Sequence, residues 1–241
     1  MAVNDPSEYA RALEAYLCKK NDGHLVRIVG PAFEQVCGWA EKGIPLTVAC
    51  RGVDRYFERY YAKGPRRRPV RIEFCEADVL DVFDEWRRAT GVAMWDNASA
   101  LPSGEGDAAG APASRRDSLP AHLERVVARL TALRGGEDRS LDEMLEAIVR
   151  ELDTARAGAK GLRGAARDAL VARLRALDGE LLDAARARAD AATLKALEKE
   201  ADGELAAFRE RMPRDAYEQS RRASVDRLLR ERARLPVIAF D

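Results

Sequence analysis

Aromatic side chains are scarce in this chain and make up only 6% of its 241 residues. Charged residues, in contrast, account for 34% of the sequence. A β-sandwich would be richer in aromatic and β-branched residues, whereas this balance suits amphipathic helices. We therefore expect a mainly helical protein.

Cysteine and histidine are scarce as well, which bears on metal binding. No two of the four cysteines have the two-residue separation that structural zinc sites favour, and His24 and His122 are the only histidines. A closed metal site would need ligands from scattered elements. We predict reduced thiols and no metal, which suits a cytoplasmic protein. The cysteines are Cys18, Cys37, Cys50 and Cys75.

Net charge and long apolar runs are also lacking. Lys and Arg number 41, as do Asp and Glu, so the field of the whole molecule gives no reason to expect nucleic acid or an anionic membrane as a partner. No apolar run approaches the ~20 residues that a membrane-spanning helix needs. Residues 1–14 lack the hydrophobic stretch of a secretion signal. We expect no membrane partner, and nucleic-acid binding would need a local basic patch.

Sequence motifs of common catalytic sites are missing. Residues 158–161 read Gly-Ala-Lys-Gly, without the hydroxyl residue and the spacing of a phosphate-binding loop. No His-Glu-x-x-His sequence occurs, and the carboxylates alternate with arginine on helical faces, where ion pairing explains them. We predict that the protein is not an enzyme, with no catalytic residues and no cofactor.

A segment over residues 97–118 divides the chain. It is rich in Gly, Pro, Ala and Ser and poor in large apolar residues, so it cannot bury enough surface to offset the entropy of ordering it. We predict a flexible linker here. The predicted domains are then residues 1–96 and residues 119–241.

The first domain shows the element order of a winged helix. Its predicted elements are a helix over 6–20, a short strand over 24–29, helices over 31–41 and 45–62, a basic turn at 66–68, a strand over 70–74 and a helix over 76–89. The helix over 45–62 would be the recognition helix, and the basic turn would form the wing. The predicted fold class is therefore mainly α, with an N-terminal winged-helix-like α+β domain.

Basic residues form a stripe on the recognition helix and continue into the wing. On the helix they recur every four residues, about opposite its apolar face. Such a stripe could neutralise several phosphates and release their counterions. The predicted nucleic-acid-binding residues are Arg51, Arg55, Arg59, Lys63, Arg66, Arg67, Arg68 and Arg71.

An alternative is that this stripe faces acidic neighbours within the fold. Residues 73–85 carry six carboxylates and no basic residue, enough to cancel the local field. In that case the stripe has a structural role or contacts protein. The acidic residues are Glu73, Glu76, Asp78, Asp81, Asp84 and Glu85.

The stretch GPAFEQVCGWAEKGIPLTVACRGVDRYFERY, residues 30–60, carries a helix, a short turn and a second helix. Around Trp39, Gly43, Ile44 and Leu46 it resembles the helical signature of primosomal and plasmid replication proteins of the DnaD type and of related winged-helix initiators. The resemblance covers about an eighth of the chain. It implies a winged-helix fold and a role in DNA replication.

The second domain, residues 119–241, carries leucine stripes that predict a helical hairpin or bundle. Such stripes also suit a coiled coil that self-associates or docks a protein partner. The apolar residues 235–240 close the chain, and we expect them to pack on the protein or on a partner, as an added strand.

Two functions follow from these patterns. The first is a non-enzymatic DNA-binding accessory protein in replication or regulation, with a helical protein-interaction arm. The alternative is a coiled-coil adaptor or scaffold that does not bind nucleic acid.

Overall fold

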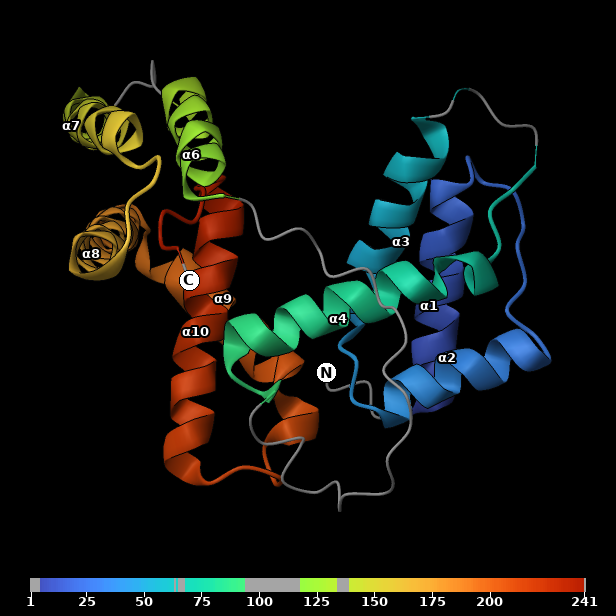
Figure 1. Ribbon diagram of the computed structural model, residues 1–241. Helices are drawn as coiled ribbons and strands as arrows, with labels where there is room; N and C mark the ends of the chain where they lie inside the picture. The colour runs from blue at the N-terminus through green and yellow to red at the C-terminus, as the bar shows by residue number, and fades with distance from the viewer. Residues whose placement is uncertain (1–4, 63, 65–67, 94–117, 134–138, 241) are drawn as a thin grey trace. The chain divides into compact units, whose positions relative to one another are not determined.

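The computed structural model describes residues 5–62, 64, 68–93, 118–133 and 139–240, and over these residues the regular elements are all helices (Figure 1). The chain forms two units. Unit 1 comprises Met1–Pro102 and Glu198–Val225, and unit 2 comprises Ser103–Leu197 and Asp226–Asp241. The predicted linker, residues 97–118, lies outside the described residues except for Ser118.

Helices follow one another in unit 1 without an intervening strand in the described residues. Asp5 caps the first by accepting a hydrogen bond from the Ser7 amide at 2.9 Å, and Pro6 and Pro31 occupy first-turn positions, where their lack of an N–H costs nothing. The N-terminal elements are α1 (Pro6–Lys20), α2 (Pro31–Glu41), α3 (Leu46–Tyr61), the 3-10 helix η1 (Ile72–Cys75) and α4 (Glu76–Thr90).

The predicted α+β winged-helix domain is wrong, because neither expected strand forms in the part of the chain that the structure describes. Residues 24–29 are irregular, and most of the segment expected over 70–74 is the 3-10 helix η1. The Asn21 side chain takes the place of a neighbouring strand. Its amide donates to the Val70 carbonyl at 3.0 Å, and its Oδ1 accepts from the Val70 N–H at 2.7 Å, so the backbone of Val70 is satisfied without a sheet.

The packing of α3 against α4 depends on a glycine. A Cβ at Gly52 would lie 2.4 Å from the Cα of Val79, so the helix backbones approach more closely than any side chain at this position permits. Val53, Phe57 and Val82 are buried in the core of unit 1. The short distance between α3 and α4 brings their charged side chains within reach of each other.

Residues 198–225 belong to unit 1, whereas the predicted domain boundary put them with residues 119–241. Leu205 and Phe208 are fully buried in the core that α1 to α4 share, and the ring of Phe208 lies 5.7 Å from that of Trp86. This part of the unit contains the end of α9 (Ala191–Glu204), the 3-10 helix η2 (Ala206–Phe208) and the first half of α10 (Arg214–Ala233).

Leucine side chains form the core of unit 2. Leu123, Leu145 and Leu174 are fully buried, each from a different helix. Ile238, from the irregular segment after α10, is fully buried in the same core. The helices that lie wholly within this unit are α6 (Leu119–Leu133), α7 (Arg139–Gly158) and α8 (Gly164–Arg188).

None of the helices that the structure describes combines the length and the apolar character needed to cross a bilayer.

Candidate interaction surface

The predicted nucleic-acid-binding residues fall in two places. Arg51, Arg55 and Arg59 project from α3, while Arg68 and Arg71 lie in the segment that leads into η1. Lys63, Arg66 and Arg67 are outside the described residues.

Carboxylates of α4 hold two of the α3 guanidinium groups. Arg55 makes paired hydrogen bonds to the Glu85 carboxylate, at 3.0 and 2.6 Å, and these bonds raise its pKa above the ordinary arginine value. Arg59 binds Asp78 at 2.5 Å, and only 8% of the Asp78 side chain is exposed. The acidic neighbours of the alternative hypothesis thus bind Arg55 and Arg59.

The other described members of the stripe differ in their surroundings. Arg71 pairs with Glu73 at 2.6 Å, Arg68 is exposed, and Arg51 is half-buried on α3. Arg55, Arg59 and Arg71 therefore each share their charge with a carboxylate. Nucleic-acid binding by this stripe stays a prediction.

Four large apolar side chains of unit 1 are exposed on residues 25–29, the start of α2 and η1. The exposed fraction is 74% for Leu25, 65% for Val29 and 58% for Phe74, and Phe33 is exposed at the start of α2. We call these four residues the 25–74 apolar surface. Large apolar side chains that gather on a surface commonly mark a protein contact site.

Several contacts hold the segments of the 25–74 apolar surface together. Along residues 25–29 the side chains alternate, with Val26 and Ile28 buried and the intervening residues exposed. Asn21, which lies four residues before Leu25, binds the backbone of Val70, and η1 packs against α2. This surface was not predicted, because Phe33 and Phe74 lie in the helix expected over 31–41 and the strand expected over 70–74, where apolar side chains are usually buried.

A cavity of about 320 Å³ lies elsewhere in unit 1, between the start of α1, the α2–α3 turn and residues 200–207. Glu41, Glu200 and Glu204 line it, and among its described lining residues there is no His, Cys, Lys or Arg. Glu204 is buried, and its carboxylate accepts hydrogen bonds from Thr47 at 2.9 Å and from the Trp86 indole at 3.0 Å. These donors fix the orientation of the carboxylate.

The charged side chains on the described lining of this cavity are carboxylates, which accept hydrogen bonds when ionised. Tyr9 also lines it, but the Tyr9 hydroxyl is buried without a hydrogen-bond partner in the described residues, and burial raises its pKa. A phenol with a raised pKa stays protonated near neutral pH and cannot act as a general base there.

The cysteines are free thiols, and burial raises the pKa of Cys50 and of Cys75 to about 12. Such thiols remain protonated and are poor nucleophiles. Within the described part of the chain, no group of three or more His, Cys, Asp or Glu side chains is placed to hold a metal ion.

No protein-family model, curated protein or solved structure matches this chain. The likeness of residues 30–60 to replication proteins of the DnaD type therefore remains a resemblance of sequence pattern.

Proposed function

We propose that this protein is a non-enzymatic helical adaptor that binds a protein partner through the 25–74 apolar surface. The observation that carries the proposal is the exposure of Leu25, Val29 and Phe74, each more than half accessible, in a unit that buries most of its other large apolar side chains. Exposure of these apolar side chains to water is unfavourable, and binding of a partner protein would bury them.

Charged residues beside the surface fit a protein contact. Arg27 and Arg71 flank it, and about two thirds of each side chain is exposed, at 67% and 66%. Each also lies near a carboxylate, Arg27 at 3.8 Å from Glu14 and Arg71 at 2.6 Å from Glu73. An apolar centre with arginine at its edge is the composition of many protein–protein interfaces.

The ion pairs of α3 favour this adaptor over the DNA-binding alternative. Counterion release requires guanidinium groups that are available to phosphates, and Arg55 and Arg59 are bound to Glu85 and Asp78. A phosphate would have to compete with carboxylates that the packing of α3 against α4 already holds in place.

Site-specific photo-crosslinking in cells tests the proposal. We expect a chain with p-benzoylphenylalanine in place of Phe33 or Phe74 to form a discrete protein adduct, because these rings would lie in the interface. Glu58, exposed on α3 in the same unit, is the matched control position and should give no such adduct.

A second variant separates loss of binding from loss of folding. Leu25→Ser in the Phe33 crosslinking chain should abolish the adduct, yet it should change the free energy of unfolding by less than about 0.5 kcal/mol, because Leu25 is exposed. Adducts that form equally from position 58, or that survive Leu25→Ser, would contradict the proposal.

A further inference from the structure

The segment after α10 lies on unit 2 in a regular pattern of burial. Pro236 and Ile238 are buried, while 53% of Val237 between them is exposed. Leu235 and Phe240 also pack against the leucine core. The described residues of this segment, 235–240, form no strand, so the added strand expected from the sequence is absent there.

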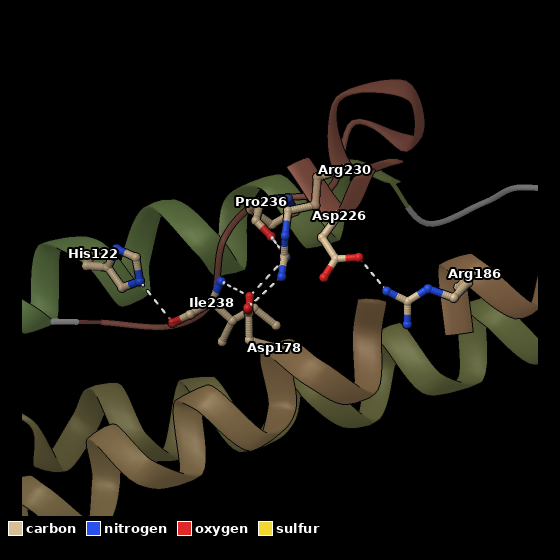
Figure 2. A network of polar contacts seen from close by, with 7 residues as sticks. All are labelled: His122, Asp178, Arg186, Asp226, Arg230, Pro236 and Ile238. Atoms are coloured by element: carbon tan, nitrogen blue, oxygen red, sulfur yellow. Dashed lines mark hydrogen bonds and ion pairs between the residues drawn. The ribbon is translucent and has the colours of Figure 1, made fainter. Parts of the chain in front are cut away.

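Side chains from two helices bind both backbone polar groups of Ile238 (Figure 2). The Ile238 N–H donates to Oδ1 of Asp178 on α8 at 2.7 Å, and the Ile238 carbonyl lies 3.1 Å from Nε2 of His122 on α6. The carbonyl only accepts, so Nε2 carries the proton of this hydrogen bond. Backbone groups held in this way, beside a side chain that is buried in the core, are typical of sites that bind a peptide segment.

Asp178 is held in position by contacts that do not involve residues 235–240. Arg230 of α10 binds both oxygens of its carboxylate, at 3.0 and 2.6 Å, and both side chains are largely buried (Figure 2). A neighbouring ion pair, Arg186 with Asp226, also joins α8 to α10. Arg230 also donates to the Pro236 carbonyl at 3.5 Å, but its two bonds to Asp178 do not involve residues 235–240. The acceptor for the Ile238 N–H would therefore stay oriented if the segment left.

Phe240 supplies a second anchor, two residues beyond Ile238. Its ring centroid lies 5.2 Å from that of His122, and the guanidinium of Arg167 lies 5.9 Å from the ring. The site thus holds the aliphatic Ile238, the small and partly buried Ala239 and the aromatic Phe240, with the backbone of Ile238 bound by Asp178 and His122.

The connection to this segment is strained at one residue. Arg234 has a φ of 57°, in the left-handed region that favours glycine, and the Leu235 N–H binds the Arg230 carbonyl at 2.9 Å to end α10. A different path for the chain at Arg234 would relieve this conformation. Short strained connections are where proteins exchange identical segments between copies.

We propose that the site formed by His122 and Asp178 also binds residues 235–240 of a second copy, so that two copies exchange these segments. The segment's own sequence is the occupant that fits the site, through Ile238 and Phe240. The exchange is reciprocal, because each copy offers both a site and a segment. It involves unit 2 alone and does not depend on the proposed function of unit 1.

A titration with a labelled peptide of residues 234–240 tests this exchange. The receptor is the full chain with Ile238→Asp, which should release its own segment and leave the site open. By fluorescence anisotropy, the natural peptide should bind this receptor at least about tenfold more tightly than it binds the wild-type chain, whose site is occupied.

Matched peptides establish which side chain the site recognises. A Val237→Asp peptide should bind within about threefold of the natural peptide, since Val237 faces solvent, whereas an Ile238→Asp peptide should bind at least about tenfold more weakly. A receptor that is folded by circular dichroism yet does not bind the natural peptide would overturn the proposal. Equal binding of the two variant peptides would overturn it too.

A measurement on the wild-type chain does not require the receptor variant to fold. Wild type refolded at high concentration should yield a dimer by size-exclusion chromatography with light scattering, and excess free peptide during refolding should prevent its formation. The Val237→Asp chain should dimerise like wild type. Refolded wild type that is monomeric at every concentration would refute segment exchange.

Discussion

Asp78 and Glu85 bind neighbouring arginines of α3, but their surroundings differ. Asp78, which binds Arg59, is buried. Glu85 and Arg55 are about half exposed, at 54% and 41% of their side chains. Removing a partner from a buried carboxylate costs more than removing one from a solvated carboxylate, because water cannot replace the lost interaction.

We therefore predict that Arg59→Ala lowers the free energy of unfolding by about 1–3 kcal/mol. Arg55→Ala, the matched control, should lower it by no more than about 1 kcal/mol, as for other exposed ion pairs. Urea titrations of the two variants measure the difference. An equal loss in both would mean that the burial of Asp78 contributes nothing to this ion pair.

Cys75 lowers the stability of the protein at alkaline pH. Burial raises the pKa of its thiol from 9.0 to about 12, and Asp78 and Glu73 contribute to the rise. Above pH 9.0 the thiol of the unfolded chain ionises while the folded one keeps its proton, so the folded state binds more protons. Stability contributed by this residue is therefore lost as the pH rises from 9.0 toward about 12.

For Cys75→Ala we expect a smaller fall in the free energy of unfolding above pH 9.0 than for wild type, by up to about 1.4 kcal/mol per pH unit. The measurement is urea unfolding in reducing buffer across this pH range. Cys50 has a similar shift in pKa, so part of the dependence should remain in the variant. Identical pH dependence of variant and wild type would contradict the assignment to Cys75.

At the scale of elements, the contact of α3 with α4 places strict limits on Gly52. Alanine there would drive its Cβ into the backbone of Val79, which cannot rotate away. We predict that Gly52→Ala destabilises unit 1 by about 2–3 kcal/mol, although alanine favours a helix more than glycine does.

Gly38 of α2 is the matched control for Gly52. Nothing that the structure describes lies within 4 Å of a Cβ built at this helical position, so Gly38→Ala should stabilise the protein by about 0.5–1 kcal/mol. Thermal unfolding monitored by circular dichroism compares the two. A shift of the melting temperature in the same direction for both would show that α3 and α4 can separate at little cost.

Helices of unit 1 were predictable from local signals, whereas the irregular segments were not. The helices expected over 6–20 and 31–41 match α1 and α2, because a proline begins each and polar or glycine residues follow each. Residues 24–29 alternate like a strand, but so does any segment that lies along a core with one side in water. The sequence does not reveal that the Asn21 side chain, rather than another strand, binds Val70.

The candidate sites, too, could be predicted from the sequence only in part. The acidic residues that bind Arg55 and Arg59 were recognisable in the sequence as an alternative, since they follow within the next helix. The exposure of Phe33 and Phe74 could not be predicted, because both have the sequence spacing that buried residues of a helix or a strand show. The site that holds Ile238 joins α6, α8 and the end of the chain, and such long-range contacts leave no local pattern.

At the scale of the whole molecule, unit 1 is built from two distant parts of the chain. Phe208 is buried against Trp86, and the Trp86 indole donates to Glu204. This arrangement was not predicted, because leucine stripes recur through residues 119–241 and favoured a single C-terminal helical domain.

We predict that Phe208→Ala lowers the free energy of unfolding of unit 1 by about 3–5 kcal/mol. Hydrogen exchange should accelerate in α4, which Phe208 contacts through Trp86. Phe74→Ala, which removes an exposed ring, serves as the control and should leave exchange in α4 unchanged. If α4 keeps its protection in Phe208→Ala, residues 198–225 are not required for the stability of this unit.

The division of unit 1 between two distant stretches of the chain has a consequence for its biosynthesis. When the first hundred residues leave the ribosome, the indole of Trp86 has neither Phe208 nor Glu204 beside it. Part of the core of the N-terminal helices then stays exposed while the intervening residues are translated. Completion of this unit is therefore a late event in synthesis.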